Sequence, residues 1–153
     1  LDGREEAAGL FLKPQASSSK RQAELSRVGG LLEQATWRLL MDFERLEVWQ
    51  RGKALSVAMY RALANCPDYG FRNQLTRAAL SIPSNIAEGM ERGGNAEKRY
   101  FLSVAKGSCA EVRTQLMVGQ EIEFLELTLA THWISETREL SRMLTGLINR
   151  ITE

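Results

Sequence analysis

The chain has 153 residues, of which 44% are hydrophobic and 25% charged, so it is long enough for one domain with a real core. Aromatic residues make up only 7% and there are three prolines, which fits a barrel or a sandwich poorly. The net charge is +1, so any affinity for nucleic acid must come from local charge. With no signal peptide and no run near the ~18 apolar residues of a membrane span, we expect a cytoplasmic protein without a membrane partner.

Residues 1–41 lack the regular helical spacing of apolar residues found in the rest of the chain. Their helical pattern is interrupted by Gly3, Gly9, Pro14, Ser17 to Ser19, Gly29 and Gly30. We expect this N-terminal extension to lie outside the main domain and to be poorly ordered or partly helical. A short helix over 20–28, or one from Leu31 into Met41, fits the spacing of its apolar residues.

A clean helical pattern begins at Phe43 and predicts a helix of about five turns. Its buried stripe consists of Val48, Gly52, Leu55, Met59 and Ala62. Beside that stripe lie Trp49, Ser56, Tyr60 and Leu63, so the buried face is broad. The sequence from Asn65 to Asp68 ends this helix, and Asp68 is the predicted cap of the next one.

The second predicted helix runs to about Arg92 and contains a proline in its interior, Pro83. An interior proline removes one backbone hydrogen bond and costs roughly 3 kcal/mol unless the helix kinks. We therefore expect a kinked helix, with the carbonyls near Ala79 and Leu80 satisfied by a side chain such as Ser81 or Ser84, by water or by a partner chain. The alternative is a helix that ends at Ile82 and restarts behind a serine cap.

Two further helices complete the predicted fold. Gly93 and Gly94 form a turn in which Asn95 is the predicted N-cap, and the third helix then ends near residues 119–122. The last helix runs from about Leu127 to Ile151. Four long helices with short connections predict an all-α fold, an antiparallel up-down-up-down four-helix bundle over residues 42–153 with a proline-kinked second helix.

Nothing in the sequence indicates catalysis, a metal or a cofactor. There is one histidine, His132, and the two cysteines Cys66 and Cys109 lie far apart without a CxxC motif. No Glu-x-x-His pair of a carboxylate metal site occurs. We therefore expect a protein that is not an enzyme.

The run from Ser81 to Gly89, with Arg77 before it and Arg92 after it, resembles the central signature of the proteins encoded in 23S ribosomal RNA intervening sequences. Leu46 to Trp49 looks like the opening motif of that family. The motif residues to which we assign a structural or interface role are Ser81, Pro83, Asn85, Glu88, Gly89, Gly107, Ser108 and Glu111. Among them, Gly107 and Ser108 are expected, with Ala105, to permit close helix approach.

The resemblance covers about residues 43–151 and implies a four-helix bundle that assembles into a homopentamer, barrel-shaped with a central opening. The family is similar in fold to the accessory variability determinant proteins of diversity-generating retroelements. In those relatives a basic surface is implicated in contacts with nucleic acid and the reverse transcriptase. A reverse transcriptase is therefore one possible protein partner.

Charge is distributed unevenly between the two halves of the predicted bundle. Residues 70–113 contain seven basic and four acidic side chains, whereas residues 114–153 contain three basic and six acidic ones. The positive half could bind phosphates of RNA or DNA, or it could meet the negative half of a neighbouring subunit, or both could be solvated helix faces. The predicted nucleic-acid-binding residues are Arg72, Arg77, Arg92, Lys98, Arg99 and Lys106. The alternative function is an oligomeric adaptor that binds a protein partner without nucleic acid.

Overall fold

The computed structural model describes residues 15–40 and 42–151, and its regular elements are all helices, joined by short turns. The elements are α1 (Gln15–Leu40), the short 3-10 helix η1 (Phe43–Arg45), α2 (Glu47–Ala62), α3 (Tyr69–Glu91), α4 (Asn95–Glu121) and α5 (Leu127–Arg150). No strand occurs among these residues, and none of their helices is long and apolar enough to cross a membrane. The boundary between two compact units falls between Leu39 and Leu40.

Helix α1 is one continuous helix that includes both ranges in which a shorter helix was expected, 20–28 and from Leu31, so only the expected break at Gly29 and Gly30 was wrong. Gly29 and Gly30 lie inside it because glycine lowers helix stability by about 1 kcal/mol but, unlike proline, keeps its backbone donor. Residues 1–14 of the predicted extension lie outside the described residues. Within α1 the side chains of Leu25, Leu31 and Leu32 are exposed.

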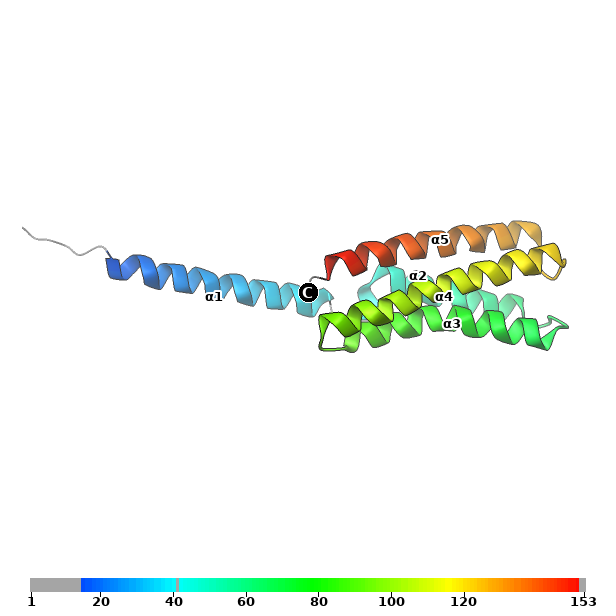
Figure 1. Ribbon diagram of the computed structural model, residues 1–153, viewed down its shortest axis with the longest axis horizontal. Coiled ribbons are helices and arrows are strands. Elements are labelled where there is room, and N and C mark those ends of the chain that lie inside the picture. Colours follow the sequence, from blue (N-terminus) through cyan, green and yellow to red (C-terminus); the bar gives the residue numbers. More distant parts are fainter. Residues whose placement is uncertain (1–14, 41, 152–153) are drawn as a thin grey trace, which may run out of the picture. The chain divides into compact units, whose positions relative to one another are not determined.

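The four helices α2, α3, α4 and α5 run alongside one another in the second unit (Figure 1). Helix α3 packs against α2 and α4, and α5 packs against α4 and α2. Each helix contributes side chains to one core. Its fully buried members are Met59, Leu63, Leu75, Ala79, Ile82, Ile86, Leu102, Ala105, Cys109, Val112, Leu116, Ala130, Leu140 and Leu144.

Helix α3 continues through Pro83, so the alternative of a helix that stops at Ile82 was wrong. The Ser84 hydroxyl donates to the carbonyl of Leu80 at 2.9 Å, as expected for a carbonyl beside the proline. Pro83 is buried, and a Cβ atom at Gly52 of α2 would lie 3.2 Å from Ile82 Cγ2 and 3.8 Å from Pro83 Cδ. Because glycine has no side chain, α2 can approach the turn of α3 that contains Pro83 without a close contact to Ile82. The kink itself stays a prediction.

Of the two predicted N-cap residues, Asp68 and Asn95, the structure confirms the first. The Asp68 carboxylate accepts a 2.8 Å hydrogen bond from the backbone N–H of Phe71, which confirms Asp68 as the cap of α3. For α4, however, the N-cap residue is Gly94 and Asn95 is already helical, so the predicted cap at Asn95 was wrong. Glycine is also tolerated at an N-cap, and a two-glycine turn can end at either residue.

A bidentate ion pair joins the first and last helices of this unit. Arg51 of α2 donates from Nε and Nη2 to the two carboxylate oxygens of Glu136 on α5, each at 2.8 Å. The two side chains are only 33% and 21% exposed, so water screens the pair incompletely. The Arg51 guanidinium holds the pKa of Glu136 below its usual range.

We predict that Glu136→Gln lowers the free energy of unfolding by about 1 kcal/mol at pH 7. Because the pKa of Glu136 is lower in the folded chain, its contribution is present above the ordinary glutamate pKa and is lost as the pH falls through the folded value. Urea unfolding at pH 7 and at about pH 3 measures this. Glu139→Gln, in an exposed pair within α5, is the control. A deficit of equal size at both pH values would contradict the prediction.

Candidate nucleic-acid interface

Three polar residues of the two sequence motifs meet where α3 packs against α4. Asn85 Nδ2 donates to the carbonyl and to Oγ of Ser81, at 2.8 and 2.9 Å. Ser108 Oγ of α4 lies 3.0 Å from Ser81 Oγ and 3.1 Å from the carbonyl of Val104. Each of these polar side chains therefore has a partner inside the helix pair, and together they fix the position of α4 along α3. The Ser108 hydroxyl is thus engaged at the α3–α4 contact.

Gly89 lies where the backbone of α3 approaches α4 closely. A Cβ atom at position 89 would lie 2.9 Å from Phe101 Cβ and 3.2 Å from the carbonyl oxygen of Lys98. Real Cβ atoms essentially never show a 2.9 Å contact, and the 3.2 Å contact, which is tighter than most Cβ contacts, is to a backbone carbonyl that cannot turn aside. The motif glycine is thus required by packing.

Gly107 behaves differently, although it belongs to the same pair of motifs. It is exposed, and no atom lies within 4 Å of the position that a Cβ would occupy. The expectation that Gly107 permits close helix approach within the chain was therefore wrong, because it points away from α3 and α5. Its neighbours Lys106 and Glu111 are exposed as well.

Alanine substitution separates these two glycines. We predict that Gly89→Ala lowers the free energy of unfolding by about 1–3 kcal/mol because the new methyl group overpacks the α3–α4 contact. Gly107→Ala, the matched control, should raise it by roughly 0.5–1 kcal/mol because alanine is the better helix former in open space. Urea unfolding followed by circular dichroism measures both. A Gly89→Ala variant as stable as the parent would contradict the packing role.

Two of the predicted basic residues are exposed and unpaired. Arg77 lies on α3 and Lys106 on α4, and neither has a hydrogen bond or an ion pair to another residue in the described part of the chain. Unpaired cations on the surface are those that can exchange their counterions for phosphates. Of the predicted residues, these two therefore define the candidate interface.

Arg92, a predicted site residue, is held by its own chain. Its guanidinium pairs with Glu88, one turn earlier on α3, and lies 3.9 Å from the carboxylate of Glu97 on α4. It also lies 5.0 Å from the centroid of the Phe101 ring. Two carboxylates offset its charge, so Arg92 offers less to a phosphate than its place in the signature implied.

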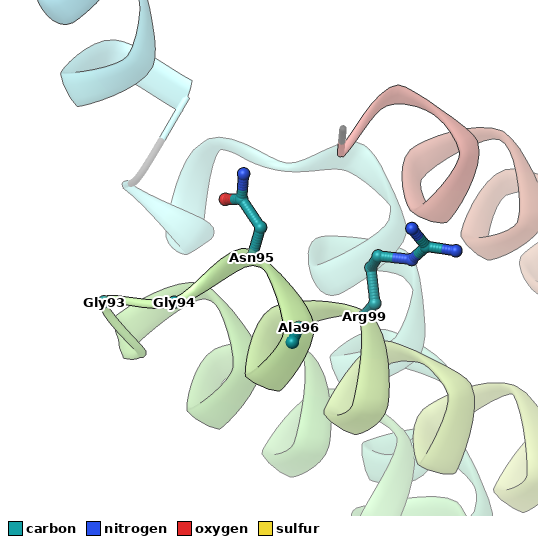
Figure 2. A pocket seen from close by; sticks show the side chains of 5 residues that line it. All are labelled: Gly93, Gly94, Asn95, Ala96 and Arg99. Carbon is teal, nitrogen blue, oxygen red and sulfur yellow. The ribbon is translucent and has the colours of Figure 1, made fainter. Parts of the chain in front are cut away.

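Lys98 and Arg99 begin α4 but differ in exposure. Lys98 is only 5% exposed, so little of it is available to a phosphate in this chain. Arg99 is half-buried and borders a surface hollow with Gly93, Gly94, Asn95 and Ala96 (Figure 2). Figure 2 shows the side chains of Asn95 and Arg99 projecting from the first turn of α4.

The remaining predicted residue, Arg72, lies apart from these groups at the start of α3. Its Nη1 atom donates to the carbonyl of Ala64 at 3.1 Å, and the guanidinium lies 4.9 Å from the centroid of the Tyr69 ring. Arg72 borders a second hollow, together with Tyr60 of α2. Tyr60 is 46% exposed and Ala62 is exposed too, so their predicted places in the buried face were wrong. The sequence did not identify Tyr60 and Tyr69 as surface residues, because helical spacing alone does not distinguish Tyr60 from a core position.

Reactive groups are sparse in this structure. No group of three histidine, cysteine or acidic side chains is placed to hold a metal within residues 15–40 and 42–151. Burial raises the pKa of the Cys109 thiol to about 11, so it is protonated at neutral pH. Cys66 is half-buried and lies far from Cys109 in the sequence.

Comparison with known proteins adds a family to this geometry. A family model described as 23S rRNA-intervening sequence protein matches residues 44–146. Among solved structures, the chain is similar to a protein of unknown function from the S23 ribosomal protein family of Bacteroides thetaiotaomicron, with 19% identity and a TM-score of 0.63. That similarity covers 66% of this chain and 97% of the other, and it shows a shared fold. No curated protein matches this chain significantly.

Proposed function

This chain belongs to the 23S rRNA-intervening sequence protein family, and we propose that it is a non-enzymatic accessory protein that binds RNA or DNA as a homo-oligomer. In this proposal residues 42–153 form an antiparallel up-down-up-down four-helix bundle. The observation that carries the proposal is the pair of exposed, unpaired cations Arg77 and Lys106 on adjacent helices. Such side chains contact phosphates without reading sequence.

The proposed oligomer is a ring in which the positive half of one subunit meets the negative half of the next. Heterologous contacts of this kind need complementary surfaces and close into a ring when the rotation permits. The resemblance to the family implies five subunits.

We predict that the full chain binds a mixed-sequence RNA at low salt and loses affinity steeply as salt is added. Arg77→Glu and Lys106→Glu should each weaken binding and reduce the slope of log affinity against log salt by about 1, because each removes one phosphate contact. The matched control is Arg138→Glu, which reverses an exposed cation on α5, in the acidic half. Fluorescence anisotropy over a salt series measures all three.

Light-scattering mass, recorded with and without RNA, tests the assembly. A ring-sized particle that takes up RNA only at low salt supports the proposal. A ring whose mass does not change when RNA is added supports instead an adaptor that binds a protein partner, such as a reverse transcriptase. A monomeric mass would contradict the oligomer on which both the RNA-binding and the adaptor functions depend. Equal losses of RNA affinity in Arg77→Glu and Arg138→Glu would contradict the proposed interface.

A further inference from the structure

A hollow of about 280 Å³ opens to the surface at the turn between α2 and α3. The hollow is lined by Tyr60, Ala64, Tyr69, Arg72, Asn73 and Thr76. Tyr60 comes from the last turn of α2 and Tyr69 is the first residue of α3, so the turn from 63 to 68 brings the two rings to one place. Pockets for drug-sized ligands measure roughly 300–1,000 Å³, so this hollow suits one small planar group.

Both tyrosines are at the surface. Tyr60 is 46% exposed and Tyr69 68% exposed, so neither is needed to fill the core. One face of the Tyr69 ring is occupied by the guanidinium of Arg72, which is itself fixed by its hydrogen bond to the carbonyl of Ala64. The ring is therefore partly oriented before any ligand arrives, and the loss of side-chain entropy on binding is small.

The polar groups around the rings are of two kinds. The Thr76 hydroxyl is already used, because it donates to the carbonyl of Arg72 at 2.8 Å. The side-chain amide of Asn73, in contrast, is half-buried and has no hydrogen-bond partner among the described residues. An amide carries both donors and an acceptor, which suits the edge of a nucleobase. One turn further along α3 lies the unpaired Arg77, within the candidate interface.

We propose that this hollow binds an unpaired base of a single-stranded nucleic acid, with the base stacked on the tyrosines and its edge facing Asn73. The inference rests on the proposed function, because it assumes that Arg77 contacts the backbone of the same strand. Stacking on aromatic side chains is how proteins hold unpaired bases, and it requires bases that are not already stacked in a duplex. The hollow would therefore give this family member a preference for single strands that phosphate contacts alone do not provide.

The test compares three RNA probes of equal phosphate number on the full chain: a single strand, a duplex, and a single strand with abasic sites. We expect the single strand to bind more tightly than the other two. Tyr69→Ala and Tyr60→Ala should each weaken single-strand binding by about 5- to 150-fold, the range of one lost base stack, and should leave duplex binding unchanged. Tyr69→Trp should bind at least as tightly as the parent, because it keeps an aromatic face.

The matched control is Tyr100→Ala, which removes an equally exposed tyrosine, 64% exposed, from α4. It should bind the single strand as the parent does. If RNA binds with a steep salt dependence but the Tyr60 and Tyr69 variants match this control, the base site is overturned and the proposed function stands. If no probe binds at any salt concentration, both are overturned. Equal affinity for the normal and the abasic strand would also overturn the base site.

Discussion

The close approach of α3 to α4 is the constraint on which the rest of the structure depends. At Gly89 the helices are too close for a methyl group, and eight residues earlier Ser81 meets Ser108 through a hydrogen bond. Two contacts at separate levels fix both the distance and the register of the pair. Two basic residues near the turn between these helices are also withdrawn from solvent or paired. Lys98 is buried there, and Arg92 forms ion pairs with two carboxylates.

Most of the helical layout could be predicted from the sequence, because it follows from strong local signals. The periodic apolar residues gave the helices, and the carboxylate of Asp68 marked the start of α3. The predictions failed where the local signal was weak. Glycine disfavours a helix only mildly, so Gly29 and Gly30 did not reveal that α1 passes through them. Asn95 and Gly94 are both acceptable caps, and backbone geometry chose between them.

The candidate site was harder to predict, because counting charges does not tell which of them are paired. The Glu88 partner of Arg92 was visible in the sequence as an acidic residue one turn earlier on a helix. The burial of Lys98 was not, since it depends on how α4 leaves the turn and packs. The outward position of Gly107 likewise required the structure: its neighbours Ala105 and Ser108 are buried, and only the rotation of α4 separates them.

Because some of the basic residues are paired within the chain, affinity for a nucleic acid would need contributions besides phosphate contacts. With Arg92 offset and Lys98 buried, only Arg77 and Lys106 of the predicted site residues are exposed and unpaired among the described residues, and two phosphate contacts give only weak, salt-sensitive affinity. A stacking site beside Arg77 would add affinity that salt does not screen. Repetition around the proposed ring would add more, because a strand held by one subunit meets the next at a high effective concentration. In the proposed function, weak single sites would therefore depend on the closed ring to give useful affinity for a nucleic acid.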